Sequence, residues 1–295
     1  MIDLHMHSTC SDGSSTVIEI LEEAKRKGLS LLSITDHDVI DAYDILKNEN
    51  IRNIFDGKIM TGMEITTTVD GELVEILGYG FDIDKMKENM KGKFLTFKEY
   101  KIREYQLALA AYKKNGIIIN ENNISFKPEY ESCRKYIMRE CYQYPENVEK
   151  MISKNSVADA TCFSRNEFYN PKSPLFVDQS GLYISFQDAI DIIHDAGGFA
   201  FLAHPFVYSK NVVERIQSII DRYNLDGLEC YYYSFTEEQT KFLLDVCEKN
   251  NLWVSGGSDY HGTVRKGVDI GTGKGDLAVD EEKCSVWTKQ LKDYR

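Results

Sequence analysis

Short apolar segments alternate with amphipathic segments in two blocks of this chain, residues 1–84 and 184–295. In the first block, residues 16–27 place apolar side chains at helical spacing before Gly28, and the apolar run 29–35 follows. The second block predicts helices and strands in strict alternation, over 186–196, 199–203, 212–223, 225–230, 237–250 and 252–256. About six or seven such units favour an α/β fold built on a parallel sheet, in a barrel or an open form.

The segment between the blocks, residues 85–183, has a different texture. It is rich in Lys, Glu, Asn and Tyr, and residues 97–115 have the pattern of a helix. Its sequence indicates no buried strand other than a candidate at 117–119. We therefore expect a mainly helical subdomain, 85–183, inserted into a barrel domain formed by 1–84 and 184–295.

The first strand leads directly into His5-x-His7. Residues i and i+2 of a strand project from the same face, so both imidazoles can point at one place, and Asp12 follows five residues later. Considered alone, this motif fits two half-buried polar residues as well as it fits two ligands of a divalent metal. The remaining strand ends decide between these readings.

Polar side chains gather where the predicted strands end, which is the active face of parallel α/β proteins. Five of the six histidines lie there, together with several carboxylates: His5, His7, Asp12, Asp36, His37, Asp38, Glu64, His204, Asp259 and His261. These nitrogen and oxygen donors, without cysteine, exceed the needs of one four-coordinate ion. They predict two or three ions of the Mn, Fe or Zn type, an arrangement suited to phosphate ester hydrolysis.

Composition excludes several other classes of protein. The formal net charge of −12 argues against binding to duplex nucleic acid, although a phosphorylated small molecule remains compatible with it. No apolar run is long enough to span a membrane, and the N-terminus lacks a leader pattern, so we expect a cytoplasmic protein with no membrane partner. Seven scattered cysteines indicate neither a disulfide framework nor a structural zinc site.

Five motifs, in order along the chain, resemble those of the PHP (polymerase and histidinol phosphatase) superfamily. They are His5-x-His7 with Ser11-Asp12-Gly13, Thr35-Asp36-His37-Asp38, Gly62-Met63-Glu64, Ala203-His204-Pro205 and Gly257-Ser258-Asp259-Tyr260-His261. The inserted subdomain makes the chain most similar to the TrpH-like branch, which includes phosphoesterases acting on nucleoside 3′,5′-bisphosphates and short oligonucleotides. The resemblance implies a distorted (β/α)7 barrel.

The resemblance also implies roles for individual residues. His5, His7, Glu64 and Asp259 would hold one metal ion, with Glu64 bridging to a neighbouring ion. Four further residues would hold another ion or contact the substrate phosphate, and are the candidate catalytic residues: Asp12, His37, His204 and His261. Either His204 or His261 would protonate the leaving oxygen.

Two positions depart from the family pattern. Glu75 stands where relatives usually carry a histidine, and a carboxylate can replace imidazole as a metal ligand. Tyr136 stands where the insert commonly has a second histidine, and a tyrosine is a poor substitute. We therefore expect fewer tightly held ions or an altered metal preference. A catalytically impaired metal- or phosphate-binding protein remains an alternative.

The insert is expected to cover the site and to recognise the substrate. Arg134, Arg139 and Lys172 are its candidate phosphate-binding residues, because guanidinium and ammonium groups bind phosphate oxygens. The run Tyr231–Tyr233 after a strand could stack on a base, although such runs commonly pack. The favoured function is hydrolysis of a phosphate monoester of a small metabolite such as a nucleoside 3′,5′-bisphosphate. The alternative is a 5′–3′ exonuclease on short oligonucleotides.

Overall fold

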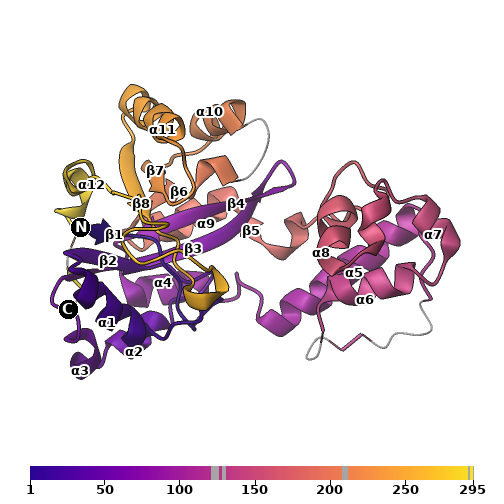
Figure 1. Cartoon of the computed structure of the whole chain (residues 1–295), viewed down its shortest axis with the longest axis horizontal. Coiled ribbons are helices and arrows are strands. Elements are labelled where there is room, and N and C mark those ends of the chain that lie inside the picture. Colours follow the sequence, from indigo (N-terminus) through magenta and orange to yellow (C-terminus); the bar gives the residue numbers. More distant parts are fainter. Residues whose placement is uncertain (121–125, 128–130, 208–211, 292, 295) are drawn as a thin grey trace. The chain divides into compact units, whose positions relative to one another are not determined.

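The strands form one continuous sheet in a computed structural model that describes residues 1–120, 126–127, 131–207, 212–291 and 293–294 (Figure 1). The strand order within these residues is β1 (Ile2–Asp3), β2 (Leu31–Ile34), β3 (Lys58–Val69), β4 (Glu72–Tyr79), β6 (Phe199–Leu202), β7 (Gly227–Tyr232) and β8 (Trp253–Gly257). The short β5 (Ile184–Ser185) pairs with β3. A parallel bridge between Met6 and Tyr260 joins the two ends, so the sheet is nearly closed into a barrel.

Most neighbouring strands are parallel, as the alternating pattern predicted. β1 pairs with β2, β2 with β3, β6 with β7, and β7 with β8, all in parallel register. Helix α1 (Val17–Lys27) makes the first crossover. Thr16 and Glu19 form its capping box, and Gly28 ends it in the left-handed conformation (φ 71°). The predicted α/β barrel class is confirmed.

The sheet contains an antiparallel strand that the alternating pattern did not predict. Asp70 and Gly71 connect β3 to β4 with φ values of 54° and 81°, the two positive angles of a tight Asp-Gly hairpin turn. β4 then runs antiparallel to β6, with Leu77 opposite Phe201. The predicted end of a strand at Glu64 is therefore wrong, because β3 continues through that residue into the hairpin.

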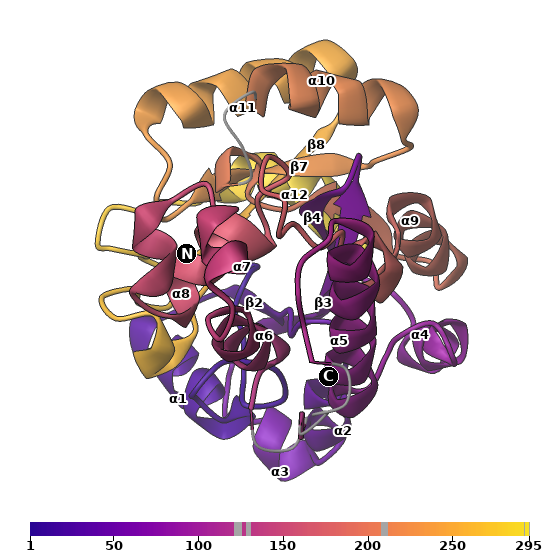
Figure 2. The same ribbon diagram turned by 90° about the vertical axis from the view of Figure 1, so that its right-hand side faces the viewer.

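The chain divides into two compact units. The barrel unit comprises residues 1–69, 73–91 and 185–295, and the helical unit comprises residues 92–184 with the hairpin tip 70–72. Helices flank the strands of the barrel unit: α2 (Ala42–Leu46), α3 (Glu49–Arg52), α4 (Ile83–Met90), α9 (Phe186–Asp195), α10 (Val212–Arg222), α11 (Glu237–Asn250) and α12 (Glu281–Thr288). Figure 2 shows α10 and α11 side by side next to β7 and β8. Because α4 packs on α9, it belongs to the barrel unit.

The helical unit has a hydrophobic core of its own. Its helices are α5 (Phe97–Lys114), α6 (Cys133–Cys141), α7 (Pro145–Glu149) and α8 (Ala160–Phe163). Buried aromatic residues fill the centre, including Tyr112, Tyr136, Phe163 and Phe168. Residues 117–119, a candidate strand, have no regular secondary structure. Within the described residues, every helix of the protein is too short or too polar to cross a membrane.

Candidate active site

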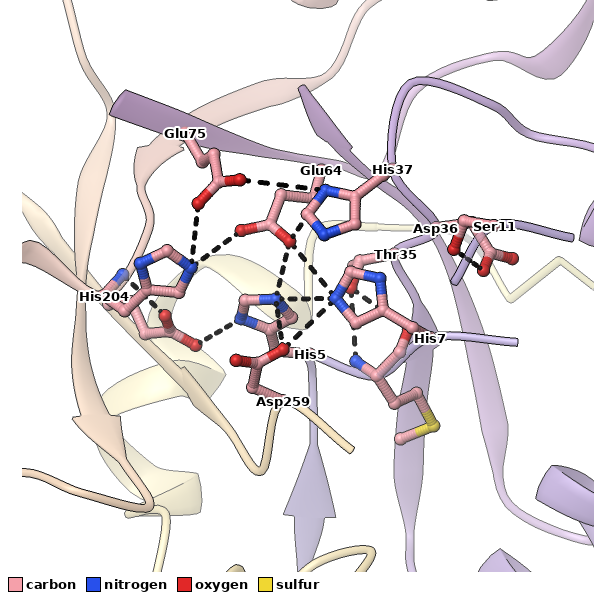
Figure 3. Close-up of polar contacts among 12 residues, drawn as sticks. His5, His7, Ser11, Thr35, Asp36, His37, Glu64, Glu75, His204 and Asp259 are labelled. Carbon is pink, nitrogen blue, oxygen red and sulfur yellow. Dashed lines mark hydrogen bonds and ion pairs between the residues drawn. The ribbon is translucent and has the colours of Figure 1, made fainter. Parts of the chain in front are cut away.

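The ends of the parallel strands and the middle of the hairpin bring the candidate ligands together inside the barrel unit (Figure 3). His5 and His7 follow β1, His37 follows β2, and His204 follows β6. Asp259 and His261 follow β8, whereas Glu64 and Glu75 lie within β3 and β4. Glu75 lies in the middle of the antiparallel strand β4, and its carboxylate faces His37 and His204. All five histidines predicted to lie at strand ends converge here.

Four buried side chains form the deepest group: His5, His7, Glu64 and Asp259, none more than 2% exposed. The Nε2 atoms of His5 and His7 lie 3.2 Å apart. Glu64 Oε2 lies 3.1 and 3.2 Å from these nitrogens, and Asp259 Oδ1 lies 3.4 and 3.3 Å from them. Bonds of about 2.0 Å to a tetrahedral zinc-type ion place the ligand atoms about 3.3 Å apart, which is close to these five distances.

The hydrogen-bonding state of this group also fits a cation. Asp259 Oδ1 is buried and has no hydrogen-bond partner among the residues that the structure describes, although it points at two imidazole nitrogens. A buried carboxylate oxygen without a donor is costly unless a cation compensates it. The donor set therefore fits a divalent metal ion held by nitrogen and oxygen ligands.

A second carboxylate, Glu229 on β7, fixes the orientation of His5. Glu229 is fully buried, and its Oε1 accepts a hydrogen bond from His5 Nδ1 at 2.9 Å. An ionised carboxylate only accepts, so the proton is on Nδ1 and the lone pair of Nε2 faces the group. The other oxygen of Glu229 accepts from the backbone N–H of His204 at 2.7 Å. Glu229 thus positions two histidine-bearing segments at once.

A more exposed group lies beside the first and contains Asp12, His37 and His261. Asp12 Oδ1 lies 3.3 Å from His261 Nε2, 4.0 Å from His37 Nε2 and 3.7 Å from His7 Nδ1. His261 Nδ1 donates to the carbonyl oxygen of Asp259 at 2.9 Å, which leaves its Nε2 available as a ligand. The Asp12 side chain is 56% exposed, so this group faces solvent.

The third group centres on the carboxylates of Glu64 and Glu75. Glu64 uses Oε2 toward His37 Nδ1 (3.4 Å) and Oε1 toward His204 Nε2 (2.9 Å). Glu75 reaches the same two nitrogens, at 3.9 and 3.4 Å. Figure 3 shows Glu64 between His5, His7, His37 and His204. The geometry allows Glu64 to bridge two ions and Glu75 to serve as a ligand.

The electric field of the site favours positive charge. Burial lowers the pKa of His5, but the carboxylates of Glu229 and Glu64 outweigh this effect and raise it well above its usual value. Burial raises the pKa of Glu64, but the surrounding histidines outweigh it and hold that pKa well below its usual value. Burial, followed by repulsion from Glu64, raises the pKa of Glu75. A field that stabilises a proton on buried imidazole also stabilises a divalent cation.

Two further aspartates of the sequence motifs support the loops of the site. Asp36 accepts hydrogen bonds from the Ser8 backbone N–H, the Ser8 hydroxyl and the Ser11 hydroxyl, at 2.6 to 2.7 Å. Asp38, with φ 56°, accepts from the Thr66 backbone N–H at 2.9 Å. These carboxylates are occupied by backbone and hydroxyl donors, so they fix the segments that carry His7 and His37.

Sequence reasoning missed Glu229 and Arg265, and it did not foresee the contact between Tyr232 and Asp259. Glu229 was included in a predicted strand, and a charged residue inside an otherwise apolar strand was the available signal. The Tyr232 hydroxyl donates to Asp259 Oδ2 at 2.7 Å, and Arg265 Nη1 contacts the same oxygen. No local pattern in the sequence indicated that Arg265 would lie beside Asp259.

The predicted phosphate-binding residues all belong to the helical unit. Arg134 stacks on the ring of Tyr169 (5.4 Å) and lies 3.8 Å from the Glu104 carboxylate. Arg139 donates twice to Glu131, at 2.9 and 3.2 Å. Lys172 is exposed on the surface of the unit.

Tyr136, at the position where the resemblance implied a histidine, lies in the hydrophobic core of the helical unit. It is 1% exposed, and its ring packs edge-on against Tyr105. It is therefore a core residue of that unit.

Comparisons with known proteins agree with the fold. The PHP domain family model matches residues 3–234, and the chain therefore belongs to the PHP domain family, as predicted. A structure from Bifidobacterium adolescentis assigned as a metal-dependent phosphoesterase has a TM-score of 0.62 at 20% identity, covering 99% of this chain and 96% of its own. An amidohydrolase structure from Chromobacterium violaceum has a TM-score of 0.61 at 23% identity, covering 94% and 91%.

Relatives of established function span nearly the same length. A 3′,5′-nucleoside bisphosphate phosphatase of Chromobacterium violaceum is 26% identical, over 92% of this chain and 90% of its own. A 5′-3′ exoribonuclease of Haemophilus influenzae is 29% identical, over 88% and 89%. The predicted class, a metal-dependent hydrolase of phosphoric esters, is confirmed by the family and by these relatives.

Proposed function

We propose that this PHP protein removes a phosphate group from a small phosphorylated metabolite, with a nucleoside 3′,5′-bisphosphate as the favoured substrate. One observation carries the proposal: the Nε2 atoms of His5 and His7 lie 3.1 to 3.4 Å from carboxylate oxygens of Glu64 and Asp259. The more exposed group around Asp12 lies beside them. The relative that matches 92% of the chain is a 3′,5′-nucleoside bisphosphate phosphatase, which supports this substrate class.

Two or three divalent ions of the Mn, Fe or Zn type would be held by the three groups, with Glu64 shared between them. Such ions supply a water nucleophile at neutral pH and neutralise the charge on the phosphoryl oxygens. His204 and His261 are the two candidates to protonate the leaving oxygen, and His261 is favoured because its Nε2 lies 3.3 Å from the exposed Asp12 carboxylate. Of the three predicted phosphate-binding residues of the helical unit, Arg134 and Lys172 would contact the substrate, whereas Arg139 is held by Glu131. The protein would act in the cytoplasm.

A second candidate is 5′–3′ exonuclease activity on short RNA. The Haemophilus influenzae relative, named as such an enzyme, matches 88% of the chain. The metal groups would serve both reactions equally. The net charge of −12 favours contact with only a few nucleotides.

The test compares substrates on protein loaded separately with Mn²⁺, Fe²⁺ or Zn²⁺. Phosphate release from adenosine 3′,5′-bisphosphate is measured beside product length from labelled RNA of two to ten nucleotides. We expect faster turnover of the bisphosphate, and stepwise shortening of RNA without bisphosphate turnover would favour the second candidate. No hydrolysis of either by any metal form would overturn both, provided that each form is shown to contain metal.

A further inference from the structure

A glycine-rich loop of the barrel unit, residues 271–275, packs against Tyr233, just after β7. Gly273 has φ 54°, and a Cβ added there would stand 2.7 Å from the Tyr233 Cβ, so only glycine permits this approach. The backbones of Asp269 and Gly273 exchange hydrogen bonds of 2.7 and 2.9 Å, which fixes the loop. The loop thereby holds Lys274 over the Tyr233 ring, with Nζ 5.0 Å from the ring centroid.

A second cation, Arg265, lies over the same ring. Its guanidinium carbon is 5.5 Å from the Tyr233 centroid. A cation–π contact at an exposed site contributes only about 0.5–1 kcal/mol, so the ring holds each cation weakly. Arg265 is also paired with Asp259, whereas Lys274 contacts no carboxylate among the described residues. An anion within reach of both side chains would add stronger, charge-assisted contacts. The pair therefore has the chemistry of an anion-binding site.

This pair adjoins the candidate metal groups. Arg265 Nη1 contacts Asp259, through Oδ2 and through the carbonyl oxygen at 3.1 Å. Within the described residues, Arg265 makes its hydrogen bonds through Nη1, while a guanidinium carries five N–H donors. Donors on Nε and Nη2 thus remain for a ligand located one side chain away from Asp259.

A pocket of about 370 Å³ begins at the same ring. Its aromatic walls are Tyr231, Tyr232, Tyr233 and Phe235, and Tyr232 is also the residue that donates to Asp259. Glu237 and Asp276 lie on the pocket lining with Lys241, and the two carboxylates disfavour an anion inside. The pocket suits a planar, uncharged group such as a nucleobase, which aromatic side chains bind by stacking.

We propose that Arg265 and Lys274 bind a second phosphate of the substrate while the first lies at the metal groups, and that the Tyr231–Tyr233 pocket receives the base. The inference rests on the proposed function and deepens it: it assigns recognition of a nucleotide carrying two phosphates to the barrel unit itself. Because the protein has a net charge of −12, the attraction of an anion by Arg265 and Lys274 is confined to their immediate surroundings.

The test uses the Lys274→Ala variant of the full chain, because Lys274 is exposed and contacts none of the candidate ligands among the described residues. Lys266→Ala, which removes another exposed lysine of the same segment, is the matched control. We expect Lys274→Ala to raise KM for adenosine 3′,5′-bisphosphate about 10-fold, the effect of losing one charged contact, with kcat nearly unchanged. KM for p-nitrophenyl phosphate, which has a single phosphate, should stay constant.

Calorimetric titration of adenosine 3′,5′-bisphosphate into metal-free protein gives a second measurement that needs no turnover. Lys274→Ala should weaken this binding about 10-fold and Lys266→Ala should leave it unchanged. Tyr233→Leu should weaken binding of the bisphosphate more than binding of ribose 5-phosphate, which lacks a base. Equal effects of the two lysine variants would overturn the inference. If wild-type protein hydrolyses none of these esters, the proposed function fails, while the titration still decides whether the anion site exists.

Discussion

Two buried glutamates, Glu167 in the helical unit and Glu64 in the barrel unit, have opposite surroundings. Glu167 of the helical unit is fully buried and accepts hydrogen bonds from the Ser156 and Ser173 hydroxyls and from the backbone N–H groups of Ile152 and Ser153. Glu64 of the barrel unit is 1% exposed and faces imidazole nitrogens instead.

The difference separates a structural carboxylate from a ligand. Hydroxyl and backbone donors satisfy Glu167 without any further partner. Imidazole nitrogens can donate or accept, and His5 already uses its Nδ1 proton on Glu229, so its Nε2 and the oxygen of Glu64 are both acceptors at 3.1 Å. Two acceptors held this close need a positive charge between them, either a proton on His5 Nε2 or a metal ion. Burial alone therefore does not identify a functional carboxylate, but the nature of its neighbours does.

The largest expected effect comes from removing a ligand of the barrel group. His7→Ala deletes one of the four donors around the deepest site, and we expect turnover to fall by about 10³-fold or more, because the metal is lost or misplaced. Metal content by plasma mass spectrometry should fall with it. The unfolding transition of the helical unit should not move. A His7→Ala variant with full metal content and full activity would contradict the assignment.

The second effect concerns Glu167, the structural carboxylate of the helical unit. Glu167→Ala leaves four donors without their acceptor inside the helical unit, so we expect a loss of about 3–5 kcal/mol in the free energy of unfolding of that unit. Metal content of the barrel unit should remain that of wild type. Urea denaturation followed by circular dichroism measures the first quantity, and mass spectrometry measures the second. Loss of metal in this variant would show that metal binding in the barrel unit depends on the stability of the helical unit.

The third effect concerns Glu229, which the sequence reasoning overlooked. Glu229→Gln keeps the shape of the side chain but weakens the hold on His5 Nδ1, and loss of such an orienting carboxylate typically costs about 10- to 100-fold in metal affinity. Competition with a fluorescent chelator gives this affinity. An unchanged affinity would mean that packing of β1 alone orients the His5 ring.

Sequence reasoning predicted features that depend on neighbouring residues, and it missed contacts between residues on different strands and loops. The capping box of Thr16, the stop at Gly28 and the positions of five histidines follow from short-range patterns. One local signal was overlooked at the end of β3, because the β-branched run 65–69 followed by Asp70-Gly71 has the pattern of a strand and a hairpin turn. Glu229 and Arg265 act on residues more than two hundred positions away or across a loop, at His5 and Asp259, and nothing in the local sequence specifies such pairings.

The fourth effect ranks the two arginines expected to bind phosphate. Arg139 is committed to Glu131 through two hydrogen bonds, whereas the guanidinium of Arg134 lies over the Tyr169 ring with Glu104 at 3.8 Å. We expect Arg134→Ala to raise KM for a nucleoside bisphosphate about 10-fold and Arg139→Ala to change it less than about 2-fold. Steady-state kinetics at matched metal content measures both. The reverse order would mean that Arg139 exchanges Glu131 for the substrate.

The smallest effect involves the one histidine outside the site. His194, 29% exposed, contacts Asp226 at 2.7 Å, and this hydrogen bond raises its pKa above the usual 6.5. A raised folded-state pKa contributes stability below pH 6.5 that is lost as the pH rises through the folded pKa. Because the pair is partly exposed, the contribution is less than about 1 kcal/mol.

The helical unit contains no histidine, so its unfolding midpoint should vary less over this pH range than that of the barrel unit. The site histidines also titrate. The difference in the free energy of unfolding between wild type and His194→Gln therefore isolates the contribution of His194. That difference should be largest below pH 6.5 and vanish at high pH. A difference that grows with pH would mean that Asp226 stabilises the neutral ring, which would reverse the sign of the linkage.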